Sequence, residues 1–181
     1  GRVLGLVGES GSGKSMTGLS IMGLIEPAGQ QVGGRVILNG QDLSHYTPEQ
    51  WRQVRGQRIA MIFQDPMVTL NPVLRIDTQM VEAVQAHALI PREEALRRCK
   101  EALVKVGIAA PDERLKAYPH EFSGGMRQRI AIAMALLHQP EVIVADEPTT
   151  ALDVTIQGQI LFQMQKLCRE SGTALIWITH D

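Results

Sequence analysis

The chain has 181 residues, of which 44% are hydrophobic and 20% are charged, and its formal net charge is −1. This composition is typical of a soluble globular domain with a sizeable core. The near-neutral charge gives no general basic surface, so no nucleic-acid partner is expected. The longest apolar runs, such as residues 130–137, fall far short of the roughly 20 residues that span a bilayer. Cys99 and Cys168 lack metal or redox spacing and are expected to be reduced thiols.

Short apolar segments alternate with glycine-rich turns and helical patterns along the first third of the chain. Short apolar runs between turn residues favour strands, whereas apolar residues spaced three and four apart favour helices. An Asn-Gly pair at 39–40 indicates a tight turn, and Pro48 suits the first turn of a helix. We expect strands at residues 3–7, 33–40 and 58–63, and helices at residues 16–25 and 48–55.

The middle of the chain has a different character. Asp65-Pro66 and Asn71-Pro72 indicate turns, and residues 76–107 then follow a helical pattern that Pro91 divides into two helices. Another helix is predicted from the Ser-Gly-Gly sequence at 123–125 to about residue 138. After it we expect a strand at residues 141–145, a helix at 155–169 and a strand at 173–179.

This order of elements predicts an α/β fold with a mainly parallel sheet and an inserted helical subdomain. We expect one domain, whose core consists of residues 1–65 and 139–181. The helical subdomain is expected at about residues 66–138.

The loop after the first strand has the pattern G-x-x-x-x-G-K-S, which is that of a phosphate-binding loop. Its backbone N–H groups and the following helix N-terminus both favour an anion. Lys14 is expected to reach the outer phosphates, and the Ser15 hydroxyl to ligate Mg²⁺. The alternative, a chance glycine-rich loop, is disfavoured because strand, loop and helix follow in the required order. Phosphate binding is expected from Gly8, Glu9, Ser10, Gly11, Ser12, Gly13, Lys14, Ser15 and Met16.

Two carboxylates, Asp146 and Glu147, end the apolar strand 141–145. Parallel sheets bind ligands at the carboxyl ends of their strands. Asp146 is expected to hold Mg²⁺, and Glu147 to polarise the water that attacks the terminal phosphate. The alternative, an acidic helix cap, is disfavoured because the same chain contains the phosphate-binding loop.

Gln64 and His180 each follow a strand at the same predicted edge. The Gln64 amide is expected to contact Mg²⁺ or water without adding charge. His180 is expected to donate a hydrogen bond to the terminal phosphate. Each residue alone would be read as an ordinary loop or strand-end residue. Their predicted roles therefore depend on the other motifs.

A second helix N-terminus follows Ser123, Gly124 and Gly125. Such a turn makes another anion site. The spacing leaves open whether the two sites meet in one chain or across a dimer.

These motifs together resemble the nucleotide-binding domain of ABC transporters, and most closely the peptide/nickel importer ATPases. The resemblance covers almost the whole chain and implies a P-loop NTPase core. Two differences stand out: Phe122 and Met126 replace the usual Leu and Gln, as in the peptide branch, and strands that the family has at both ends are missing. We therefore expect a fragment, incomplete at both ends. The matching motifs are the phosphate-binding loop, Gln64, 65–67, 71–72, 118–121, the signature 122–129, 146–147, 151–153 and His180.

The resemblance implies an ATPase that uses ATP and Mg²⁺ to power uptake of peptides or nickel. Lys14, Gln64, Glu147 and His180 are the expected catalytic residues, and Ser15, Gln64 and Asp146 the metal-binding ones. The implied partners are transmembrane permease subunits, a second ATPase subunit and, indirectly, an extracytoplasmic substrate-binding protein. The implied location is peripheral, on the cytoplasmic face of the inner membrane.

Two other functions compete with this interpretation. A soluble ABC ATPase not linked to transport would favour a long coiled-coil insertion or a basic surface, and neither pattern is seen. A non-catalytic ATP-binding regulatory module would be expected to lack a residue such as Glu147.

Overall fold

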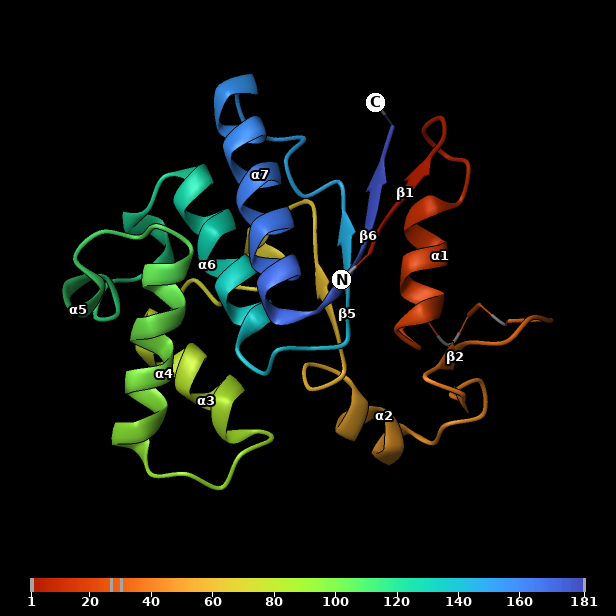
Figure 1. The fold of residues 1–181 in the computed structure, drawn as a ribbon, viewed down its shortest axis with the longest axis horizontal. Coiled ribbons are helices and arrows are strands. Elements are labelled where there is room, and N and C mark those ends of the chain that lie inside the picture. Colours follow the sequence, from red (N-terminus) through yellow and green to blue (C-terminus); the bar gives the residue numbers. More distant parts are fainter. Residues whose placement is uncertain (1, 27, 30, 181) are drawn as a thin grey trace.

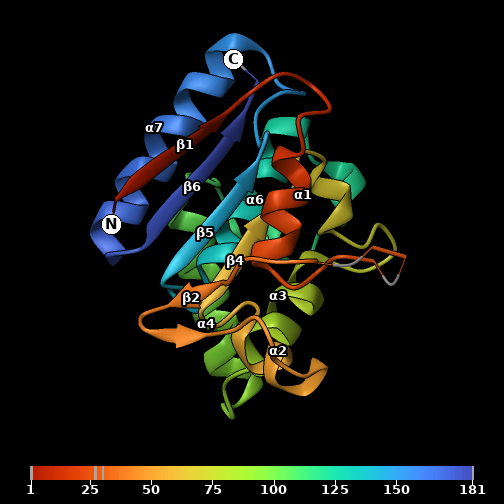
Figure 2. The ribbon, with the colours of Figure 1, turned by 90° about the vertical axis from the view of Figure 1, so that its right-hand side faces the viewer.

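A parallel four-stranded sheet forms the centre of the part of the chain that the structure describes. The structure is a computed structural model, and it describes residues 2–26, 28–29 and 31–180. The strands of the sheet are β1 (Val3–Val7), β4 (Ile59–Ile62), β5 (Val142–Asp146) and β6 (Ala174–Thr179). The strand order is β1-β6-β5-β4, and each neighbouring pair is parallel (Figures 1 and 2). The predicted α/β fold is therefore confirmed.

Helices cover both faces of this sheet (Figure 1). Helix α1 (Lys14–Ile21) lies on one face, where Val144 and Ile178 belong to one buried cluster. Helices α6 (Gly124–Leu136) and α7 (Val154–Ser171) lie on the other face. There Ile143 and Leu175 belong to a second, larger buried cluster. Successive strand residues thus pack on opposite layers, as the alternation of side chains along a strand requires.

The region between β4 and β5 is mainly helical, as predicted. Its buried side chains, such as Met80 and Leu103, belong to the same cluster as Ile62 and Ile143 of the sheet. The hydrophobic core is therefore continuous from the sheet into the helices. The boundaries of a separate helical subdomain, at about residues 66 and 138, stay a prediction. The helices before α6 are α3 (Ile76–Gln85), α4 (Arg92–Lys105), α5 (Pro111–Arg114) and two 3₁₀ turns, η1 (Pro66–Val68) and η2 (Pro119–Glu121).

Helix α1 is displaced from the predicted range 16–25: it begins at Lys14 and ends at Ile21. Two features explain the early end. Gly23 has a left-handed backbone, with φ of 62°. Arg55 donates hydrogen bonds to the carbonyl oxygens of Met22, at 2.9 Å, and Gly23. Arg55 lies at the end of α2 (Pro48–Val54), so a residue 33 positions away caps this helix.

The predicted strand at 33–40 is mostly irregular. Only β2 (Ile37–Leu38) is a strand, and it pairs antiparallel with β3 (Gln41–Asp42), which was not predicted. Asn39 and Gly40 both have positive φ, so the predicted turn closes a short hairpin.

Glu141 links this hairpin to the sheet through hydrogen bonds. Its Oε1 accepts a hydrogen bond from Arg58 Nε at 2.6 Å, and its Oε2 accepts one from Asn39. Arg58 also donates to Gln41 Oε1 at 2.7 Å. The bond to Glu141 raises the pKa of Arg58. Arg58 and Glu141 are each partly shielded from solvent, with 26% and 32% of their side chains exposed.

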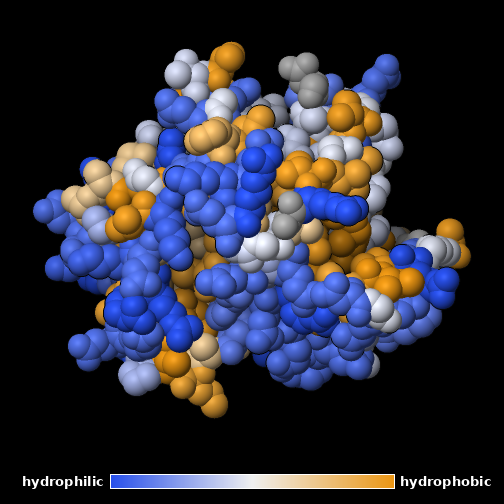
Figure 3. Space-filling view, in the orientation of Figure 1, coloured by the Kyte–Doolittle hydropathy of each residue, from blue (hydrophilic) through white to orange (hydrophobic). Residues whose placement is uncertain are grey.

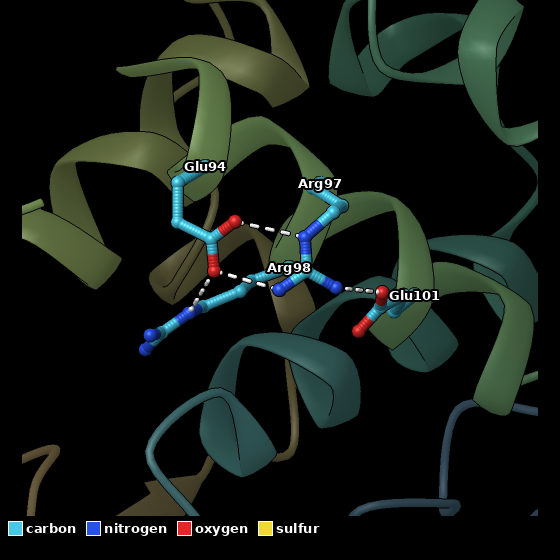
Figure 4. Close-up of polar contacts among 4 residues, drawn as sticks. All are labelled: Glu94, Arg97, Arg98 and Glu101. Atoms are coloured by element: carbon cyan, nitrogen blue, oxygen red, sulfur yellow. Dashed lines mark hydrogen bonds and ion pairs between the residues drawn. The ribbon is translucent and has the colours of Figure 1, made fainter. Parts of the chain in front are cut away.

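A network of ion pairs runs along the exposed side of α4 (Figure 4). Glu94 accepts hydrogen bonds from Arg97, at 2.7 and 2.8 Å, and from Arg98, at 3.2 Å. Arg97 also reaches Glu101. These bonds, chiefly those from Arg97, lower the pKa of Glu94 to about 2. The network supports the helix at its surface, where such pairs add little stability.

Apolar side chains also reach the surface. They gather where β1 and α1 lie (Figure 3), and Val3, Leu4 and Val7 of the edge strand β1 are exposed there. No helix of the described residues is both long and apolar enough to cross a membrane.

We predict that Glu141→Ala lowers the free energy of unfolding by about 1–2 kcal/mol, because Arg58 loses a charge-assisted, partly shielded partner. Glu170→Ala is the matched control, since its pair with Lys166 is 3.9 Å long and exposed. It should change stability by less than about 0.5 kcal/mol. Urea denaturation of the two variants measures both values, and equal effects would contradict a special role for Glu141.

Candidate active site

The phosphate-binding loop connects β1 to α1 and has the backbone that its glycines predict. Gly11 and Gly13 have φ of 79° and 89°, which side chains with a Cβ rarely adopt. Gly13 is the N-cap of α1, so the loop leads directly into the helix N-terminus. The N-terminal N–H groups of α1 therefore lie beside the loop, where they favour an anion.

Lys14 lies inside this loop, with only 7% of its surface exposed. Its Nζ donates to the carbonyl oxygens of Gly8, at 2.6 Å, and Glu9, at 2.7 Å, and lies 3.5 Å from Ser12 Oγ. All three partners are neutral, and no ion pair among the described residues involves Lys14. A shielded cation with neutral partners suits a negatively charged ligand.

The sheet register brings the other predicted residues to the same edge. Val7 is paired with Thr179, so the loop and His180 follow neighbouring strands. Asp146 is paired with Ile178, and the N–H of Glu147 donates to the Ile178 carbonyl at 3.0 Å. The backbone pairing of the strands therefore brings these residues together, independently of any side-chain contact.

Ser15 and Asp146 are in direct contact. The Ser15 hydroxyl donates to Asp146 Oδ1 at 3.1 Å, although the residues are 131 positions apart. A hydroxyl and a carboxylate offer the oxygen ligands that Mg²⁺ prefers, so these residues fit the predicted ion. Their role as metal ligands stays a prediction.

Glu147 contacts two other side chains at this edge, His180 and Thr150. Its Oε2 lies 3.1 Å from His180 Nδ1 and accepts a hydrogen bond from Thr150 Oγ1 at 3.1 Å. The Glu147 side chain is 17% exposed, and that of His180 is 48% exposed. Glu147 has φ of 43°, in the left-handed region that few non-glycine residues adopt. Such strain often accompanies functional sites.

Thr150 is the site residue that sequence reasoning missed. It lies three residues after Glu147, a spacing at which a hydroxyl can reach back across a turn. That spacing was the available signal.

Gln64 is exposed and follows β4. Ile62 of β4 is paired with Ala145, so Gln64 lies at the edge next to Asp146 and Glu147. No hydrogen bond among the described residues joins Gln64 to either carboxylate. Its predicted contacts with metal and water stay predictions.

Ser123 is the N-cap of α6, and its hydroxyl accepts a hydrogen bond from the Met126 N–H at 3.3 Å. The next residues pack close to the start of α7: a Cβ on Gly125 would lie 3.1 Å from Ile156. Figure 1 shows α6 beginning on the far side of α7 and the sheet from the loop before α1. One chain therefore does not bring Ser123 to its own phosphate-binding loop.

Comparisons with known proteins agree with this geometry. The family model described as ABC transporter matches residues 1–150. A probable peptide ABC transporter ATP-binding protein of Sinorhizobium fredii is 56% identical over the whole chain, which covers 54% of that protein. The oligopeptide transport ATP-binding protein OppD of Bacillus subtilis is 50% identical over the whole chain, which covers 51% of it. The chain thus spans about half the length of these curated relatives.

The fold also matches solved structures. A dimeric ATP-binding cassette, MJ0796, in a post-hydrolysis state with ADP and phosphate, has a TM-score of 0.80 and 28% identity to this chain. The match covers 99% of this chain and 74% of that one. Because the family model covers most of the sequence and the fold agrees, the chain belongs to the ABC transporter family.

Proposed function

We propose that this chain binds and hydrolyses ATP as the ATPase subunit of a transporter that imports peptides through separate membrane subunits. The observation that carries the proposal is the convergence of the phosphate-binding loop, the Ser15–Asp146 pair and Glu147 at one sheet edge. The names of the relatives support peptides, rather than nickel, as the cargo.

The phosphates of ATP would bind at the loop and the N-terminus of α1. Lys14 would exchange part of its contact with the Gly8 and Glu9 carbonyls for phosphate oxygens. Ser15 and Asp146 would hold Mg²⁺, which supplies positive charge that offsets the charge of the phosphates. The loop N–H groups are fixed by the backbone, so little reorganisation is needed when the ligand binds.

Hydrolysis would be an in-line attack of water on the terminal phosphorus. A new P–O bond forms from the water oxygen, and the bond to the bridging oxygen breaks as ADP leaves. Glu147 accepts the proton that the water loses, and His180 donates a hydrogen bond to the terminal phosphate. Gln64, on the neighbouring strand end, would help to orient the water. The products are ADP, inorganic phosphate and a proton.

A second ATPase subunit would complete the site. Helix α6, whose N-cap is Ser123, begins on the far side of α7 from the phosphate-binding loop, so its anion-binding turn is available to a partner (Figure 1). The solved relative MJ0796 is dimeric, which supports this arrangement. Contact with the membrane subunits would use the segment after Gln64, where Val68 and Val73 are 65% and 74% exposed. The proposed location is therefore peripheral, at the cytoplasmic face of the inner membrane.

Glu147→Gln in the full-length protein should bind ATP but hydrolyse it about 10²–10⁴ times more slowly, because a positioned proton acceptor is lost. Single-turnover hydrolysis of labelled ATP measures the rate. Glu113→Gln, in the short helix α5, is the matched control and should behave as wild type. A wild-type rate for Glu147→Gln would rule out this role.

Mixed dimers of full-length chains test whether the site is shared. One subunit carries Lys14→Ala and the other carries Ser123→Arg, which places a bulky cation in the second anion-binding turn. A shared arrangement leaves one intact site, built from Lys14 of one chain and Ser123 of the other. We expect ATP trapping at one site per mixed dimer and almost none in either mutant alone.

If each chain instead closed its own site, both sites of the mixed dimer would be damaged. No trapping in verified mixed dimers would then contradict the shared arrangement. Should the natural partner be a different ATPase subunit, the two changes are placed one in each subunit.

A further inference from the structure

The Glu147 carboxylate is held through only one of its two oxygens. Both side-chain contacts that the described residues make to it, from Thr150 Oγ1 and His180 Nδ1, go to Oε2 at 3.1 Å. Oε1 is therefore left to accept a hydrogen bond from a water molecule. The carboxylate is oriented on one side and open on the other.

The contact from Thr150 is built into the turn that follows β5. The Thr150 N–H donates to the Glu147 carbonyl at 3.3 Å, so backbone and side chain close the same turn. The Glu147 N–H donates a hydrogen bond to the Ile178 carbonyl, and this bond links the turn to β6. This geometry fixes where the Thr150 hydroxyl lies relative to the carboxylate.

Stability does not explain this hydrogen bond. Thr150 is exposed, so its hydroxyl would be satisfied by water if it turned away. The terminal torsion of a glutamate is broad, and a single contact to the partly exposed His180 constrains it weakly. A second donor to Oε2 restricts the rotation of the carboxylate that would carry Oε1 away from a bound water molecule.

We propose that Thr150 is a positioning residue for Glu147. Its hydroxyl holds Oε2 so that Oε1 faces the attacking water. The inference rests on the proposed ATP hydrolysis and assigns no contact between Thr150 and ATP. Small displacements of a reacting group lower rates strongly, so loss of the hydroxyl should affect turnover rather than nucleotide binding.

The test compares variants of the full-length protein assembled with its partner subunits. Thr150→Val removes the hydroxyl and keeps the shape, Thr150→Ala removes it without adding a methyl group, and Thr150→Ser keeps it. Thr155→Val is the matched control, because Thr155 is an exposed threonine near the start of α7. The readouts are kcat, KM for ATP and equilibrium affinity for ATP.

We expect kcat to fall about tenfold in Thr150→Val and Thr150→Ala, with KM and ATP affinity within about twofold of wild type. Thr150→Ser should retain at least half of the wild-type kcat, and Thr155→Val should match wild type. Wild-type kcat in both hydroxyl-deleted variants would overturn the proposal. So would equal losses in Thr150→Ser and Thr150→Val, or a tenfold loss of ATP affinity.

A double mutant separates this inference from the proposed function. In the Glu147→Gln background, adding Thr150→Val should slow single-turnover hydrolysis by less than twofold, since the group that Thr150 positions is already disabled. A further tenfold loss would mean that Thr150 acts elsewhere and would overturn the proposal. If Glu147→Gln alone hydrolysed ATP at the wild-type rate, the role of Glu147 would be wrong and this inference would fail with it. If the wild-type protein bound ATP but did not hydrolyse it, the proposed function itself would fail, whatever the Thr150 variants showed.

Discussion

The backbone pairing of β1, β6 and β5 is the constraint on which the candidate site depends. Parallel strands end at the same edge, and the pairs Val7–Thr179 and Asp146–Ile178 set how far each strand extends there. The phosphate-binding loop starts directly after Val7. His180 directly follows Thr179, and Glu147 directly follows Asp146. A shift of one residue in either pairing would turn every side chain of the strand to the other face. The buried clusters on both faces therefore hold the site in register.

The two faces of the sheet carry the two helix ends that are proposed to bind anions. Gly18 of α1 lies close to the sheet, since a Cβ there would be 3.1 Å from Ile178 and 3.2 Å from Val144. This contact positions the helix that is proposed to bind the phosphates. On the opposite face, Gly125 of α6 packs against the start of α7. One sheet thus separates two helix N-termini, and this separation is the observation behind the proposal that a second subunit completes the site.

Local patterns predicted most of the fold and most of the residues that the sheet register brings to one edge, because short apolar strands and a glycine-rich loop carry their signals within a few residues. Features that depend on distant residues were missed or misplaced. The end of α1 depends on Arg55, and the β2–β3 hairpin depends on Glu141. Thr150 was missed because its hydroxyl matters only once the turn after β5 is formed. Sequence spacing likewise left open whether the Ser123 turn meets the loop of its own chain.

In the proposed function, the loop between β1 and α1 binds the phosphates of ATP through Lys14. Titration calorimetry of ATP with Mg²⁺ into full-length wild-type protein and Lys14→Ala is the decisive experiment. Lys166→Ala, a change of an exposed lysine on α7, is the control. We expect Lys14→Ala to bind ATP at least tenfold more weakly, because a shielded charge-assisted donor is lost, and Lys166→Ala to bind as wild type. Unchanged affinity in a folded Lys14→Ala protein would show that Lys14 does not bind the phosphates.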